Sequence, residues 1–416
     1  QKAFSFLGRL PDLKKKKAGL IIGISGCVAQ QEGKKILGRF PYVDIILGTH
    51  AIGRLPQLVN QIEKERCRIV DIKMSEEMEE IECANRFHRG DVSSFVTIMQ
   101  GCDNFCTYCV VPYVRGRERS RAPENIIQEI CGLVASGTKE VTLLGQNVNS
   151  YGKKEGLCSF PELLRRVNDI EGLLRIRFTT SHPKDLSDEL VYAFKDLEKV
   201  CGHFHLPVQC GSNKILKKMN RKYTRQSYLE RVDKLRQVRP EIAITSDMIV
   251  GFPGETRADF EETLDLIKKV EFDGLFAFIY SERPNAPASA FPDQIDLKEK
   301  KERLQELLDL QEGFTKKKNE ALVGKSELVL VEGLSKKQNE PGSEGRLHDF
   351  QLTGRTSGNK IVNFAGNDTG VCGNEVFTGR IVNVRIEKAF AHSLWGKALK
   401  SDFPCHGLKG DATYAA

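Results

Sequence analysis

The sequence predicts an α/β protein in three parts: a partial N-terminal α/β domain, a central six-unit partial (β/α) barrel and a small C-terminal β-barrel. Six strand-like apolar runs alternate with helical patterns between residues 90 and 290. This alternation indicates a parallel sheet, because parallel strands are joined by crossover helices. Short strand patterns rich in glycine follow, as is typical of a small barrel. The predicted boundaries are 1–75, 88–318 and 321–388, with a tail at 389–416.

The N-terminal part has a shorter α/β pattern. Strand-like runs occupy 18–26, 42–48 and 67–72. Helical patterns lie between them at 31–40 and 52–65, and we expect Pro56 to break the second helix. The acidic run that follows, at 75–82, indicates an exposed linker.

The central strands are expected to form an open barrel, since six units are too few to close an eight-fold one. Pro123 and Gly137 mark the start and end of the first crossover helix. The ligands of such folds gather at the carboxyl ends of the strands. The six predicted strands lie at 95–99, 140–145, 173–180, 203–208, 242–251 and 274–281.

A long helix is predicted at 296–322, with Asp296 as its N-cap. After it, the pattern changes to the short strands of the C-terminal barrel. These strands are predicted at 327–333, 350–358, 360–366 and 377–389. The remaining residues show no clear period, which is why we expect a loose tail there.

Composition excludes several classes of protein. The chain is 40% hydrophobic and 29% charged, a globular balance, and no apolar run reaches the length of a membrane helix. Twelve cysteines in 416 residues do not indicate a disulfide scaffold. We therefore expect a soluble cytoplasmic protein with no membrane partner. Its net charge of +7 permits a nucleic-acid partner without requiring one.

Three cysteines stand together in the sequence QGCDNFCTYC. Cys102, Cys106 and Cys109 have the spacing C-x-x-x-C-x-x-C and follow the first central strand. A zinc site normally takes a fourth Cys or His ligand, and this loop contains none. Three thiolates suit a 4Fe-4S cluster and leave one iron open for a ligand. The alternatives are three buried core cysteines or a zinc knuckle.

This spacing on the loop after the first strand of a six-unit barrel resembles the radical S-adenosylmethionine enzymes. Further stretches resemble their methylthiotransferase family, most closely the branch that acts on isopentenyladenosine in tRNA. The C-terminal barrel resembles the TRAM domain, an RNA-binding module of that family. The stretches that carry the resemblance are SGCVAQ, QGCDNFCTYCVVPYVRGRERSR, LLGQNVNSYG, LPVQCGSNKILKKMNRKYTR and DMIVGFPGET.

The resemblance implies a reaction and its cofactors. Cys102, Cys106 and Cys109 would hold a 4Fe-4S cluster whose open iron binds S-adenosyl-L-methionine, which one electron cleaves to methionine and a 5′-deoxyadenosyl radical. Sulfur from a second 4Fe-4S cluster would be inserted at carbon 2 of an adenine next to the anticodon. A second S-adenosylmethionine would supply the methyl group. The implied partners are tRNA, an electron donor such as flavodoxin or ferredoxin, and a sulfur donor or iron–sulfur carrier.

The sequence departs from the family pattern in three places. Of the three cysteines that hold the second cluster in the family, only Cys27 has a match, and we expect the other two to lie upstream of Gln1 in a longer protein. Asn285 and Ala286 stand where the family usually has Gly-Thr. Cys210 stands where serine is commoner, and we interpret it as a neutral change.

Polar residues at strand ends are the predicted contacts of S-adenosylmethionine. They are Gly145, Gln146, Ser181, Gln209 and Asp247. Each of them is equally well explained as a hydrogen-bonded residue at a loop start. His182 and His205 also fall near strand ends, where a lone histidine is more often structural.

Two basic segments should face the open mouth of the barrel and neutralise RNA phosphates. The predicted RNA-binding residues are Arg115, Arg117, Arg119, Arg121, Lys217, Lys218, Arg221 and Lys222. The alternative is a pair of solvated basic faces. In the C-terminal barrel, Phe350 and Arg355 are possible stacking residues, whereas Phe364 fits the core better.

Other functions remain open at this point. If the reaction is methylthiolation, the alternative substrates are threonylcarbamoyladenosine in tRNA and an aspartate of a ribosomal protein. The alternatives from a different functional class are a non-enzymatic iron–sulfur carrier or RNA-binding regulator, and a zinc-stabilised RNA-binding protein. We favour the isopentenyladenosine branch because of the stretch VVPYVRGRERSR.

Overall fold

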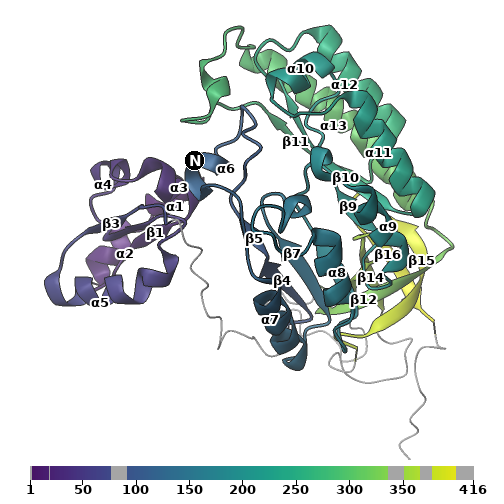
Figure 1. The fold of residues 1–416 in the computed structure, drawn as a ribbon, viewed down its shortest axis with the longest axis horizontal. Helices are drawn as coiled ribbons and strands as arrows, with labels where there is room; N and C mark the ends of the chain where they lie inside the picture. Colours follow the sequence, from purple (N-terminus) through teal and green to yellow (C-terminus); the bar gives the residue numbers. More distant parts are fainter. Residues whose placement is uncertain (1, 18, 76–90, 336–350, 366–376, 400–416) are drawn as a thin grey trace, which may run out of the picture.

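The computed structural model describes residues 2–17, 19–75, 91–335, 351–365 and 377–399, which form three connected parts (Figure 1). The predicted acidic linker, apart from Ser75, and the predicted stacking residue Phe350 lie outside these ranges. No helix within the described ranges is both long and apolar enough to cross a lipid bilayer.

The N-terminal part is a parallel sheet in the order β1-β2-β3, flanked by short helices. Gly33 divides the helix predicted at 31–40 into α3 and α4, since its φ of +49° suits glycine. Pro56 lies in the first turn of α5, where proline is tolerated, so it starts this helix instead of breaking it. The elements are α1 (Lys2–Leu7), α2 (Pro11–Lys16), β1 (Gly23–Ser25), α3 (Cys27–Glu32), α4 (Lys35–Arg39), β2 (Ile45–Leu47), η1 (Ile52–Arg54), α5 (Leu55–Glu65) and β3 (Ile69–Asp71).

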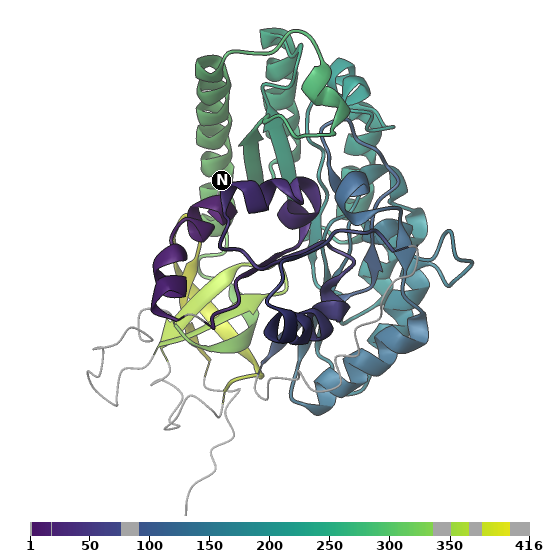
Figure 2. The same cartoon turned by 90° about the vertical axis from the view of Figure 1, so that its left-hand side faces the viewer.

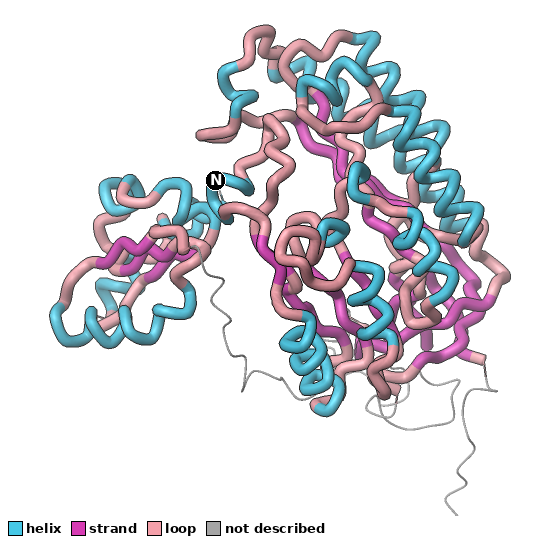
Figure 3. Tube along the Cα trace, in the orientation of Figure 1, coloured by secondary structure: helices cyan, strands magenta, loops and turns pink. Residues whose placement is uncertain are grey.

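All six central strands are confirmed. They form two parallel sheets in the orders β4-β7-β8 and β9-β10-β11, which meet where Ile176 pairs with Val200. Among the described strands, β4 and β11 are the outer edges, so the barrel is open as predicted (Figure 3). The strands are β4 (Ser93–Thr97), β7 (Glu140–Leu144), β8 (Arg175–Phe178), β9 (His203–His205), β10 (Ala243–Val250) and β11 (Gly274–Ile279), with a small antiparallel pair, β5 (Met99–Gln100) and β6 (Arg119–Ser120).

Helices cover the outer face of these strands (Figure 1). Outward side chains such as Val96, Leu143 and Ile176 are buried in one continuous core with the apolar faces of the helices. The longest described helix, α13, is capped by Asp296, which accepts from the backbone N–H of Lys298 at 2.7 Å, as predicted. The helices are α6 (Val111–Arg115), α7 (Pro123–Ala135), η2 (Val148–Ser150), α8 (Phe160–Asn168), η3 (Pro183–Asp185), α9 (Asp188–Asp196), α10 (Asn213–Lys218), α11 (Arg225–Val238), α12 (Arg257–Val270), η4 (Pro287–Ala290) and α13 (Leu297–Glu320).

Five described strands of the C-terminal part close into a barrel in the order β12-β13-β14-β16-β15. Phe364 is buried in its core, as expected. The tail predicted from residue 389 needs correction, because Leu394–Ala398 pairs with both β14 and β15. The prediction from the sequence missed this strand because it is short. In addition, its middle inward position is Gly396, which has no side chain to contribute to an apolar–polar alternation. The strands are β12 (Ser326–Leu334), β13 (Gln351–Thr356), β14 (Ile361–Ala365), β15 (Ile381–Ala389) and β16 (Leu394–Ala398).

The C-terminal barrel is attached at the amino-terminal end of the central strands, and buried arginines of β8 hold it there. Arg175 donates to the carbonyls of Arg355 at 2.6 Å and Leu328 at 2.8 Å. Arg177 donates to the carbonyls of Thr356 at 2.7 Å and Ser357 at 3.0 Å. The turn between β13 and β14 is thus fixed against the base of the central barrel, opposite the strand ends where ligands gather.

Replacing Arg177 should loosen this attachment. Its side chain is 7% exposed, and its guanidinium also forms a 2.9 Å ion pair with buried Glu140, so Arg177→Ala leaves a carboxylate and two carbonyls buried without their donor. We expect the free energy of unfolding to fall by about 3–5 kcal/mol, measured by denaturant titration. The surface variant Arg165→Ala is the control and should cost less than about 1 kcal/mol. Equal effects of the two variants would contradict this account.

Candidate active site

The three cysteines lie on a loop, residues 101–117, at the carboxyl end of the first central strand; we call it the cysteine loop. Its ends meet where the N–H of Cys102 donates to the carbonyl of Gly116 at 3.3 Å. Gly101 has a φ of +78°, and a Cβ atom there would lie 2.0 Å from the carbonyl oxygen of Arg117. Only glycine fits this crossing, because the opposing atoms are backbone and cannot move aside.

Each of the three thiols accepts a hydrogen bond from a different donor. The Sγ of Cys102 accepts from Asn104 Nδ2 at 3.5 Å, and the Sγ of Cys109 accepts from the backbone N–H of Val111 at 3.4 Å. The Sγ of Cys106 accepts from the guanidinium of Arg221 at 3.4 Å. Donors aimed at sulfur are the surroundings that iron–sulfur thiolates use, since such bonds tune the cluster.

Burial shapes the acidity of these thiols. It raises the pKa of Cys102, and it raises the pKa of Cys109 to about 11. Without a metal both groups are therefore protonated at neutral pH, and metal binding would release their protons. In the described ranges no three His, Cys, Asp or Glu side chains converge closely enough to hold a single metal ion. A four-iron cluster is held at its corners, so its ligands need not converge on one point.

The predicted S-adenosylmethionine contacts differ in their surroundings. Gln146 Oε1 accepts from the N–H of Gly101 at 2.6 Å, so it anchors the cysteine loop. Gly145 is packed against Met99, whose side chain a Cβ atom would meet at 2.4 Å. Gln209 adopts a φ of +75° beside β10. Asp247 lies inside β10, not at a strand end as predicted, and its Oδ1 lies 3.5 Å from His205 Nε2.

The neighbouring loops contain buried polar atoms that have no hydrogen-bond partner. Among the described residues, Ser181 Oγ and both amide atoms of Asn149 make no hydrogen bond. His182 Nε2 is also unpartnered, whereas its Nδ1 accepts from the N–H of Lys184 at 3.2 Å. Burial lowers the pKa of His182 to about 2, so this ring is neutral and offers an N–H donor at Nε2. Such atoms suit a polar ligand. Asn149 was not among the site residues predicted from the sequence.

The predicted RNA-binding residues separate into two groups. Lys217, Lys222 and Arg117 are exposed, and Lys217 and Lys222 line a cavity of about 450 Å³ between α10 and α11. Arg115, Arg119 and Lys218 are half-buried.

The other two positions require correction. Arg121 pairs with Glu129 at 2.6 Å and donates to the carbonyl of Thr97 at 2.7 Å. Arg221 is buried behind the cysteine loop. Both guanidiniums are therefore engaged inside the protein, and spacing in the sequence cannot show which members of a basic run turn inward.

Cys27 begins α3, and α3 packs against α6, the helix that follows the cysteines. The N-terminal part is joined to α6 by the hydroxyl of Thr49, which donates to the carbonyl of Val114, and by His50 Nε2, which lies 3.1 Å from the carbonyl of Arg115. Figure 2 shows this part in front of the central barrel. Cys27 therefore begins the helix of the N-terminal part that packs against the end of the cysteine loop.

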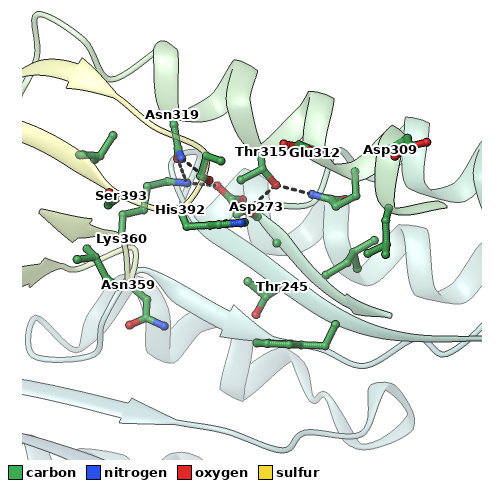
Figure 4. A pocket seen from close by; sticks show the side chains of 18 of the residues that line it. Thr245, Asp273, Asp309, Glu312, Thr315, Asn319, Asn359, Lys360, His392 and Ser393 are labelled. Atoms are coloured by element: carbon green, nitrogen blue, oxygen red, sulfur yellow. Dashed lines mark hydrogen bonds and ion pairs between the residues drawn. The ribbon is translucent and has the colours of Figure 1, made fainter. Parts of the chain in front are cut away.

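A separate cavity of about 560 Å³ lies between α13, the base of β11 and the C-terminal barrel (Figure 4). Lys360 reaches across it to Asn319 Oδ1 at 2.8 Å and Asp273 Oδ1 at 3.5 Å. None of the three loop cysteines and none of the predicted S-adenosylmethionine contacts lines it. We therefore assign this cavity to the junction between the two barrels.

An open six-stranded barrel with three thiols after its first strand defines a radical S-adenosylmethionine domain. The chain matches the Radical SAM superfamily over residues 96–267 and the TRAM domain over residues 320–399. Its fold is similar to a solved radical S-adenosylmethionine methyltransferase from Kitasatospora setae, with a TM-score of 0.52 and 14% identity over 68% of this chain and 60% of that one.

Curated relatives identify the particular family within this superfamily. The tRNA-2-methylthio-N(6)-dimethylallyladenosine synthase of Desulfosudis oleivorans is 54% identical over 99% of this chain and 88% of its own length. The synthase of the same name from Syntrophus aciditrophicus is 52% identical over 96% of this chain and 83% of its own length. The chain belongs to this family of tRNA-2-methylthio-N(6)-dimethylallyladenosine synthases.

The crossing at Gly101 generates a prediction. Gly101→Ala places a methyl group against the backbone of Arg117, which displaces the loop on which Cys102 stands. We expect the anaerobically reconstituted variant to lose most of its iron and sulfide, measured per chain by chemical analysis. Gly38→Ala is the control, because Gly38 has nothing within 4 Å of its added Cβ. Iron content in Gly101→Ala equal to that of the wild type would refute this role.

Proposed function

We propose that this protein adds a methylthio group to carbon 2 of isopentenyladenosine next to the anticodon of tRNA. The observation that carries the proposal is the cysteine loop, with three hydrogen-bonded thiols at the carboxyl end of an open barrel. The family to which the chain belongs supports the choice of this reaction over the other methylthiotransferase branches.

Cys102, Cys106 and Cys109 would hold a 4Fe-4S cluster, which would bind the cosubstrate S-adenosylmethionine. When bound, the cluster supplies the electron that cleaves this cosubstrate. Ser181, Asn149 and the neutral His182 offer buried polar atoms to orient it. Gln146 acts indirectly, since it fixes the start of the cysteine loop at Gly101.

Cys27 is the one described residue that we assign to a second, auxiliary cluster. The packing of α3 against α6 supports this role, because a sulfur source has to face the site of radical chemistry. An electron donor such as flavodoxin or ferredoxin reduces the first cluster, and a sulfur donor or iron–sulfur carrier renews the second. A tRNA substrate places the reaction in the cytoplasm.

An exposed aromatic pair beside the cysteines is suited to unpaired RNA bases. Phe105 and Tyr113 are 36% and 37% exposed, with ring centroids 6.3 Å apart and the planes at 84°. The guanidinium of Arg117 lies 5.0 Å from the Phe105 ring centroid. Asn220 Nδ2 donates to the Phe105 carbonyl at 2.9 Å and links this pair to the basic cavity of Lys217 and Lys222. Bases stack on such rings while lysines meet phosphates.

The central test replaces one ligand of the first cluster. Cys106→Ala should abolish release of 5′-deoxyadenosine from S-adenosylmethionine by the reduced, reconstituted protein. In a deletion strain it should also fail to restore 2-methylthio-isopentenyladenosine, measured by nucleoside analysis of tRNA. Cys131→Ala is the control, since Cys131 is exposed on α7, and it should behave as the wild type.

Three outcomes would overturn the proposal. Wild-type protein that restores a different modification points to another branch of the family. Wild-type protein that releases no 5′-deoxyadenosine points to a non-enzymatic iron–sulfur protein. Zinc in place of iron and sulfide points to a structural metal site.

The aromatic pair gives a prediction about RNA binding. Phe105→Ala should weaken tRNA binding by about 1–3 kcal/mol, the contribution of one stacked base, measured by filter binding at fixed salt. Tyr192→Ala removes an exposed ring from α9 and serves as the control; its affinity should equal that of the wild type. The same loss in both variants, or in neither, would exclude stacking on Phe105.

A further inference from the structure

Arg221 follows α10 and has its guanidinium buried beside the cysteine loop. The residue is 4% exposed. Besides its bond to Cys106 Sγ at 3.4 Å, the guanidinium donates to the Pro207 carbonyl at 2.6 Å and to the Tyr223 hydroxyl at 2.9 Å. A further contact joins it to the Tyr108 hydroxyl at 3.3 Å. These bonds fix the plane of the group and direct one N–H to sulfur.

Within the part of the chain that the structure describes, this buried cation has no carboxylate partner. The structure gives Arg221 no ion pair with any described Asp or Glu, whereas the buried guanidiniums of Arg177 and Arg303 pair with Glu140 at 2.9 Å and Glu255 at 2.6 Å. Removing a charge from water is costly unless an opposite charge compensates it. Among the described residues, Arg221 therefore faces no negative charge that would offset its burial.

The thiolates of a bound cluster provide that charge. Three thiolates outweigh the positive charge of a four-iron core, so the loaded site is anionic, and each electron added makes it more so. A fixed cation that donates to a ligand sulfur stabilises the more negative, reduced state most strongly. Hydrogen bonds to sulfur and local charge are the means by which proteins set cluster potentials.

We propose that Arg221 is the counter-charge of the cluster and raises its reduction potential, which makes reduction by the electron donor easier. Arg221 is then a positioning residue that acts through Cys106. The inference rests on the proposed function, because it requires a 4Fe-4S cluster on Cys102, Cys106 and Cys109. It replaces the prediction from the sequence that Arg221 binds RNA.

The test compares two variants by redox titration followed by electron paramagnetic resonance, without RNA or S-adenosylmethionine. Arg221→Gln keeps a hydrogen-bonding side chain but removes the charge, and we expect at least a tenfold shift of the reduction equilibrium towards the oxidised cluster. For a one-electron couple this corresponds to about 59 mV. Arg221→Lys retains the charge. Its shift in reduction potential should be less than half the shift seen in Arg221→Gln.

Lys234→Gln is the matched control for loss of one positive charge. Lys234 pairs with Asp188 on the outer helices, and its removal should leave the potential unchanged. An Arg221→Gln cluster with the wild-type potential would overturn the inference. Equal shifts in Arg221→Gln and Arg221→Lys would also overturn it, because the charge would then not be the cause.

A measurement on the unaltered protein keeps the inference testable if Arg221→Gln fails to fold. Pulsed electron paramagnetic resonance of the reduced cluster, in protein labelled with ¹⁵N-arginine, should detect a weak nitrogen coupling. No coupling would contradict a guanidinium beside Cys106. The two proposals fail separately: a wild-type protein without a 4Fe-4S cluster defeats the proposed function, whereas a normal cluster with an unchanged potential in Arg221→Gln defeats only this inference.

Discussion

The backbone crossing at Gly101 is the constraint on which the site depends. It fixes where the chain leaves the first strand of the barrel, and Gln146 and the carbonyl of Gly116 hold the loop from either side. The three thiols are then presented on a short, restrained segment, each with its own hydrogen-bond donor. A flexible loop would first have to be ordered before it could bind a cluster, at a cost in conformational entropy.

The two ends of the central barrel carry different features. The carboxyl ends of the strands carry the cysteine loop, the unpartnered polar atoms around Ser181 and the exposed aromatic pair. The amino ends are joined to the C-terminal barrel by Arg175 and Arg177. For the proposed reaction, an RNA bound at both places has to extend along the barrel (Figure 1). The hydrogen bonds of Arg175 and Arg177 hold the C-terminal barrel at that distance.

The sequence predicted the fold well where the signal is local and repeated. The six central strands, the helix capped by Asp296 and the buried Phe364 follow from periodicity and capping chemistry. Strand β16 was missed, because a five-residue strand with glycine at an inward position shows no alternation. The cysteine spacing predicts the site, whereas the inward turn of Arg121 and Arg221 depends on tertiary contacts that spacing cannot show. The unpartnered amide of Asn149 is equally invisible without the structure.

The most direct measurement is spectroscopy of the anaerobically prepared wild-type protein with and without S-adenosylmethionine. A 4Fe-4S cluster on the cysteine loop, with three protein ligands and one open iron, should change its Mössbauer and electron paramagnetic resonance spectra when the cosubstrate is added. A cluster with four protein donors at this loop, or spectra that do not respond to S-adenosylmethionine, would contradict the account.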